Sequence, residues 1–133
     1  MFEAWTLRQE SVKDKDEKLS NAVRALSDSQ KASYFKEYNK LLKDPDTFAV
    51  LNWFFLAGLH HFYLGKFARG FMNLGVMSLG IISLFQAPQI GFVLVGGIIL
   101  IEMPALFRSQ IIVESHNTNL GQQILESRNR TLT

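Results

Sequence analysis

The sequence contains no cysteine, which excludes both a disulfide framework and a thiolate metal site. It also has no apolar run behind a basic N-terminal start, so we expect no cleaved secretory signal. It contains neither a nucleophile motif nor a phosphate-cradling glycine loop. We therefore expect a protein that is not an enzyme, uses no cofactor and binds neither nucleic acid nor a small-molecule substrate.

Charge is almost absent from the middle of the chain. Residues 47–107 carry only Lys66, Arg69 and Glu102, whereas the segments on either side contain many charges of both signs. A helix on the surface of a soluble protein needs a polar face, and an uncharged run above about 18 residues is the usual signal of a membrane span. The sequence therefore predicts an all-α integral membrane protein. The alternative is a soluble bundle of very apolar helices, which the missing polar face disfavours.

The apolar middle region has one clear interruption. Pro88 lacks a backbone donor and restricts Ala87 to an extended conformation, so we expect a turn between two spans, residues 70–86 and 89–107. An earlier apolar segment, residues 48–65, is just long enough to be another span. The predicted fold thus has two or three transmembrane helices.

The polar N-terminal region, residues 1–46, is predicted to form two amphipathic helices. Ser27 and Gln30 have the spacing of a capping box, which begins the second helix, and Asp44 before Pro45 ends it. The first helix has an apolar seam at intervals of seven residues, which contains Trp5, Val12, Leu19 and Leu26.

The second helix has an aromatic face and a separate basic stripe. The aromatic face contains Tyr34, Phe35 and Tyr38, and the stripe contains Lys36, Lys40 and Lys43. Either the helix lies on the bilayer with its lysines at anionic headgroups, or its aromatic face packs on the first helix or on a partner subunit. Because basic residues favour the cytoplasmic side, we expect a cytoplasmic N-terminus. Residues 108–133 are expected to be a polar C-terminal tail, whose side depends on the number of spans.

Two adjacent histidines, His60 and His61, stand near the end of the first apolar segment. Neighbouring residues on a helix point about 100° apart, so this pair is not expected to chelate one metal ion, and we predict no metal site. An acidic residue inside a span, such as Glu102, usually has a partner. We predict a structural latch in which His61 or Arg69, beside His60, pairs with Glu102 and ties the first span to the last. The alternative is an ion or proton pathway through these residues.

The stretch "GLHHFYLGKFARGF" resembles the signature of the TM-two domain family, which comprises small membrane proteins with two spans. His60 falls on the histidine of the family pattern, His61 replaces its arginine, and Glu102 stands at its aspartate. The resemblance covers about residues 43–107 and is closest to bacterial members. It implies a membrane architecture without a known reaction. It also implies a turn between spans formed by the matching residues Phe62, Tyr63, Leu64, Gly65, Lys66 and Gly70.

The sequence thus predicts a small multi-pass protein of the bacterial inner membrane that acts as an interaction or scaffold subunit. Its partners would be the lipid bilayer and other protein chains, in a homo-oligomer or a larger complex. The alternative is a component of an oligomeric ion or proton channel that uses Glu102 together with His60 and His61.

Overall fold

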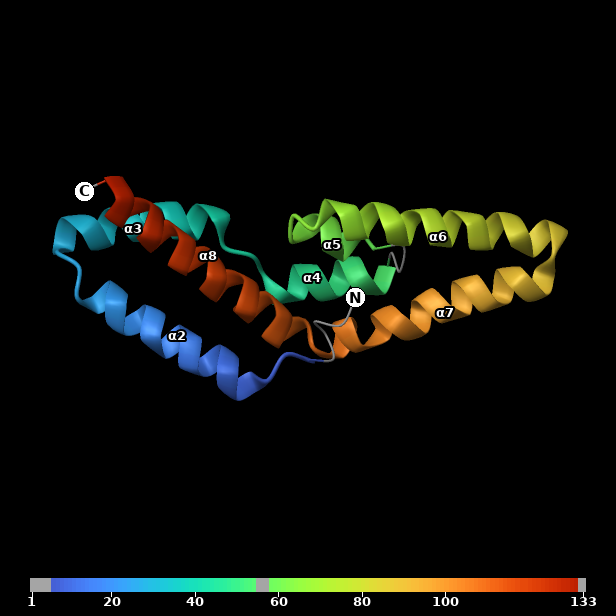
Figure 1. Ribbon diagram of the computed structural model, residues 1–133, viewed down its shortest axis with the longest axis horizontal. Helices are drawn as coiled ribbons and strands as arrows, with labels where there is room; N and C mark the ends of the chain where they lie inside the picture. The colour runs from blue at the N-terminus through green and yellow to red at the C-terminus, as the bar shows by residue number, and fades with distance from the viewer. Residues whose placement is uncertain (1–5, 55–57, 132–133) are drawn as a thin grey trace.

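The computed structural model describes residues 6–54 and 58–131, and all regular secondary structure in these residues is helical, which confirms the expected all-α class (Figure 1). At one end of the molecule three helices form a bundle, and at the other end two long helices form a hairpin (Figure 1). Two short helices lie between them. In chain order the helices are α2 (Gln9–Arg24), α3 (Asp28–Leu41), α4 (Pro45–Phe54), α5 (Leu59–Tyr63), α6 (Phe67–Gln86), α7 (Pro88–Phe107) and α8 (Ser109–Thr131).

The two N-terminal helices, α2 and α3, lie where the sequence predicts them. Ser27 and Gln30 form the predicted capping box: the Ser27 hydroxyl accepts a hydrogen bond from the Gln30 N–H at 3.4 Å, and Gln30 Oε1 accepts one from the Ser27 N–H at 3.0 Å. The apolar seam of α2 is buried at Val12 and Leu19. Trp5, the first residue of that seam, lies outside the described residues.

The C-terminal segment, expected only as a polar tail, forms the helix α8. This helix packs along α2, α3 and α4, and its buried face contains Val113, Thr118, Gly121 and Ile124. Gly121 allows a close approach, because a Cβ at this position would lie 2.6 Å from both Leu19 Cδ2 and Tyr34 Oη. The N- and C-terminal regions are therefore parts of one helical bundle rather than two separate regions.

Helices α6 and α7 form the hairpin, and their bounds are close to the predicted spans 70–86 and 89–107. The turn between them is at Ala87, and Pro88 is the first residue of α7, where its missing N–H costs no helical hydrogen bond. Within the described residues, these are the two helices long and apolar enough to cross a membrane. Gly91 lets the helices meet closely near the turn, since a Cβ there would lie 2.6 Å from the backbone nitrogen of Leu84.

The first expected span, residues 48–65, is not one continuous helix. In the described residues α4 ends at Phe54 and the five-residue helix α5 begins at Leu59. Gly58, between them, has a φ of 95°, a left-handed conformation that interrupts a right-handed helix and favours glycine. The expectation of a long helix over this segment is therefore corrected to two short helices at the base of the hairpin (Figure 1).

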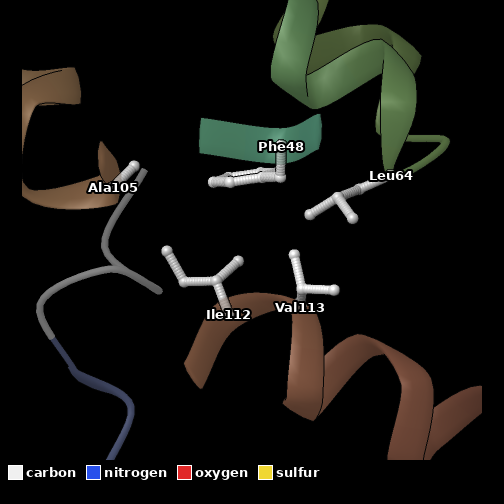
Figure 2. Packing of buried hydrophobic residues seen from close by; sticks show 5 residues of the cluster. All are labelled: Phe48, Leu64, Ala105, Ile112 and Val113. Carbon is white, nitrogen blue, oxygen red and sulfur yellow. The ribbon is translucent and has the colours of Figure 1, made fainter. Parts of the chain in front are cut away.

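A small apolar core joins the bundle to the hairpin. Side chains from α4, α7 and α8 and from the residue after α5 pack together in it, and Figure 2 shows Phe48, Leu64, Ala105, Ile112 and Val113. The chain between α3 and α4 is tied to α8 by two hydrogen bonds, since Lys43 N–H donates to Asn117 Oδ1 at 3.0 Å and Asn117 Nδ2 donates to the Lys43 carbonyl at 2.8 Å. These contacts fix the base of the hairpin against the bundle.

Candidate functional site

A buried polar cluster lies at the base of the hairpin, where four helices meet. Asn52 comes from α4, His60 and His61 from α5, Asn73 from α6 and Glu102 from α7. Glu102 and the two histidines were predicted from the sequence, and the structure brings all three together. The two asparagines were not predicted, although each is a polar residue in a largely apolar run.

The Glu102 carboxylate is the centre of this cluster. His60 Nε2 lies 3.0 Å from Glu102 Oε2, and His61 Nε2 lies 3.3 Å from the carboxylate. Asn73 Nδ2 donates to Glu102 Oε1 at 2.7 Å, and Asn52 Nδ2 donates to the Glu102 carbonyl at 3.3 Å. Three side chains from two other helices therefore bond one carboxylate, while a fourth holds the backbone of the same residue.

The cluster is shielded from solvent. Asn52 and His60 are 0% exposed, and Asn73 and Glu102 are 4% and 7% exposed. A carboxylate only accepts hydrogen bonds, so each histidine contributes an Nε2–H donor. Burial lowers the pKa of His60, against the opposing effect of its hydrogen bond to Glu102. Burial therefore favours the neutral form of His60.

The two adjacent histidines have a common partner, although neighbouring positions on a helix point in different directions. Both rings reach Glu102, with their centroids 4.1 Å apart and their planes at 43°. The Cβ directions on a helix differ by about 100°, but two rotatable bonds per side chain let the ring ends converge on a third residue. Arg69, the other predicted partner of Glu102, lies half-buried in the first turn of α6, and its role in a latch stays a prediction.

The residues of the predicted turn hold α5 against its neighbours. Gly65 has a φ of 73°, and the N–H groups of Gly65 and Lys66 donate to the carbonyls of Phe62 and His61 at 2.9 and 2.8 Å. This is the Schellman pattern that ends a helix at a left-handed glycine. The ring of Phe62 fills the space beside Gly70, where a Cβ would lie 2.5 Å from Phe62 Cε2. The turn therefore sets the path of the chain from α5 into α6.

Tyr63 connects the same turn to the chain before α4. Its hydroxyl accepts a hydrogen bond from the Asp44 N–H at 2.8 Å, and Lys43 Nζ lies 4.8 Å from the centre of its ring. Asp44 in turn accepts hydrogen bonds from the hydroxyl and the N–H of Thr47, both at 2.7 Å, and these bonds lower the pKa of Asp44. The motif thus links three helices through ordinary packing and hydrogen bonds.

The aromatic face of α3 packs mainly within the chain. Tyr34 is buried against α2 and α8 with Leu19 and Ile124, and its ring stacks on that of Tyr38 at 5.6 Å. Burial, with smaller contributions from Tyr38 and Asp16, raises the pKa of Tyr34 to about 12. Of the two interpretations for this face, packing on the first helix therefore describes Tyr34, whereas the remaining predicted surface residues Phe35, Lys36 and Lys40 are exposed and Lys43 is half-buried.

Comparison with protein-family models, curated proteins and solved structures found no match to this chain. The resemblance of residues 43–107 to the TM-two domain family therefore stays a prediction.

Proposed function

We propose that this chain is an integral membrane protein with two spans, α6 and α7, that acts as an interaction or scaffold subunit. The observation that supports it best is the exposure of the hairpin. Only 17% of the most apolar window of α6 and 22% of that of α7 are buried inside the molecule. An apolar core helix of a soluble protein is mostly buried, whereas a span turns its apolar side chains toward lipid. Those exposed here include Phe71, Leu79, Phe85, Phe92, Val93, Leu100 and Phe107.

The distribution of basic residues supports an orientation. Lys66 and Arg69 stand at the start of α6, and Arg108 follows α7, so these cations lie at the base of the hairpin beside the bundle. The tip, residues 86–89, carries no charge. The positive-inside rule then favours a cytoplasmic bundle, with the hairpin tip on the far side of the membrane. Both polar ends of the chain would share the cytoplasmic side, because α8 packs on α2.

Cysteine labelling in intact cells or oriented vesicles tests this topology directly, because the chain contains no cysteine of its own. We expect Ala32→Cys in α3 and Gln123→Cys in α8 to react with a membrane-impermeant maleimide only from the cytoplasmic side. Gln89→Cys at the tip should react only from the opposite side. All three positions are exposed. Labelling of Ala32→Cys and Gln123→Cys from opposite sides would contradict the two-span arrangement.

The bundle offers a surface for the proposed subunit contact. A groove of about 400 Å³ lies between α2 and α3, lined by Leu19, Val23 and Tyr34 among others, with Arg24 and Lys31 also in its wall. Phe35 lines the same groove and is exposed. An exposed aromatic residue beside an apolar groove is typical of the anchor positions of protein interfaces.

Photocrosslinking in native membranes tests the subunit role. A photoreactive amino acid in place of Phe35 should give a discrete crosslinked species, either a second copy or another membrane subunit. The same amino acid in place of Asp14, which is exposed on α2 and does not line the groove, should give none. Phe35→Asp should abolish the isolated complex while leaving the helix content unchanged. A strictly monomeric protein in nanodiscs, with no crosslink from Phe35, would refute the proposal.

The alternative, a channel component, has less support from the structure. The carboxylate of Glu102 is engaged by three side chains, and Arg69 is the only other charged residue in α6 and α7. A conduction path through this chain would need further polar groups along the hairpin. A proton flux in liposomes that disappears with Glu102→Gln would nevertheless favour the channel over the scaffold.

A further inference from the structure

Three potential metal ligands converge in the buried cluster. His60, His61 and Glu102 each offer a ligand atom, and these atoms all lie within 4.8 Å of one another. The two histidine nitrogens approach the same oxygen, Glu102 Oε2, at 3.0 and 3.3 Å. From this geometry we propose that the cluster is a binding site for a divalent transition-metal ion of the zinc class.

The observed spacing is close to that of a zinc site. With metal–ligand bonds of about 2.0–2.2 Å in a tetrahedral arrangement, neighbouring ligand atoms lie about 3.3–3.6 Å apart. The distances of 3.0 and 3.3 Å from Oε2 to the two nitrogens therefore need only small changes to become two edges of such a site. The ion would take the positions of the two Nε2 protons, and each imidazole would carry its proton on Nδ1 instead. For His60 this is a buried atom without a hydrogen-bond partner among the described residues, which weakens the affinity of the site.

The chemistry of the ligands selects the kind of ion. Two imidazoles and one carboxylate suit zinc and its neighbours in the first transition series, whereas calcium and magnesium prefer oxygen ligands alone. Asn73 already orients the carboxylate through its hydrogen bond to Oε1. Hydrogen-bond partners outside the ligand shell commonly orient metal ligands in this way. Three protein ligands leave a fourth position for water or for a group from a partner.

Two further features of the cluster favour a bound cation. The first is charge, because a buried carboxylate is stabilised by a positive ion. The second is an unsatisfied acceptor: Asn52 is fully buried, and its Oδ1 has no hydrogen-bond partner among the described residues. The Nδ2 group of Asn52 donates to the backbone carbonyl of Glu102, so this amide lies beside one of the three proposed ligands.

Zinc binding to the full chain in nanodiscs tests the proposal. After treatment with a chelator and addition of zinc sulfate, we expect one zinc ion per chain by elemental analysis, and competition with a chromophoric chelator gives the affinity. Glu102→Gln and His61→Gln should each weaken binding at least tenfold. Asn73→Ala should weaken it by about 10–100-fold, the usual effect of an outer-shell partner. His116→Gln is the matched control, because it removes the remaining histidine of the chain and should bind like the original.

Several outcomes would overturn the site. Zinc retention by the unmodified chain no greater than that of empty nanodiscs would show that the cluster holds only protons. Equal binding by His61→Gln and the unmodified chain would place the zinc elsewhere. Loss of zinc binding in His116→Gln, but not in the cluster variants, would also place the zinc outside the cluster. Because the unmodified chain decides the first outcome, a variant that fails to fold does not remove the test.

Discussion

Replacement of Glu102 by alanine measures how much the buried cluster contributes to stability. The change removes the acceptor shared by His60, His61 and Asn73. His60 and Asn73 are 0% and 4% exposed, so neither can turn its donor to water, whereas the His61 side chain is 13% exposed. A buried donor without an acceptor costs about 1–3 kcal/mol, so two of them cost about 2–6 kcal/mol. Removal of the buried carboxylate offsets part of this cost, and we expect the free energy of unfolding to fall by about 2–4 kcal/mol.

Reversible unfolding in mixed micelles, followed by far-ultraviolet circular dichroism, measures this loss. Met103→Ala is the matched control, because it shortens the neighbouring side chain, which is partly exposed, without touching the cluster. Glu102→Gln should lose less than Glu102→Ala, since its amide oxygen still accepts a hydrogen bond. If Glu102→Ala unfolds at the same denaturant level as Met103→Ala, the cluster does not hold the hairpin, and the latch hypothesis is wrong.

Three further predictions concern the bundle and the turn. Gly121→Ala should destabilise the bundle by about 1–3 kcal/mol, because the added methyl group meets Leu19 and Tyr34; an unchanged melting temperature would contradict this packing. Gly65→Ala should cost about 1–2 kcal/mol in the free energy of unfolding, because Gly65 has a positive φ; Gly75→Ala, in open space within α6, is the control for the same assay. Burial raises the pKa of Tyr34 to about 12, above its value in the unfolded chain, so its contribution to stability is complete below about pH 10 and is lost as the pH rises through about 12. Melting temperatures measured across this range should fall more steeply for the original chain than for Tyr34→Phe, and parallel curves would refute the assignment.

Local sequence patterns predicted the helices that depend on local physics. The capping box at Ser27, the stop before Pro45 and the turn at Pro88 each follow from backbone geometry within a few residues. The bounds of α6 and α7 follow from two apolar runs divided at Pro88, and this pattern needs no knowledge of neighbouring helices.

The structure breaks the expected span at residues 48–65 and adds a helix to the expected polar tail, and packing between helices explains both results. The segment 48–65 has the length and hydropathy of a span, yet Gly58 breaks it, and a Cβ at Gly58 would lie 2.7 Å from Cβ of Asn73. The C-terminal segment looks polar on average, but Val113, Gly121 and Ile124 lie on one helical face. Gly121 and Ile124 pack on α2 and α3, and Val113 packs in the core shared with α4 and α7. An apolar face at intervals of three and four residues was the available signal for α8.

The sequence by itself determined the helical class, the two long apolar helices and the identity of the unusual polar residues among them. These properties depend on composition and on interactions between residues close together in the chain. Only the tertiary structure decided that His60, His61 and Asn73 meet at Glu102, and that α8 returns to the N-terminal helices. Both results depend on how helices far apart in the sequence cross and on which side-chain rotamers that crossing allows, and neither quantity is encoded in the spacing of residues along one helix.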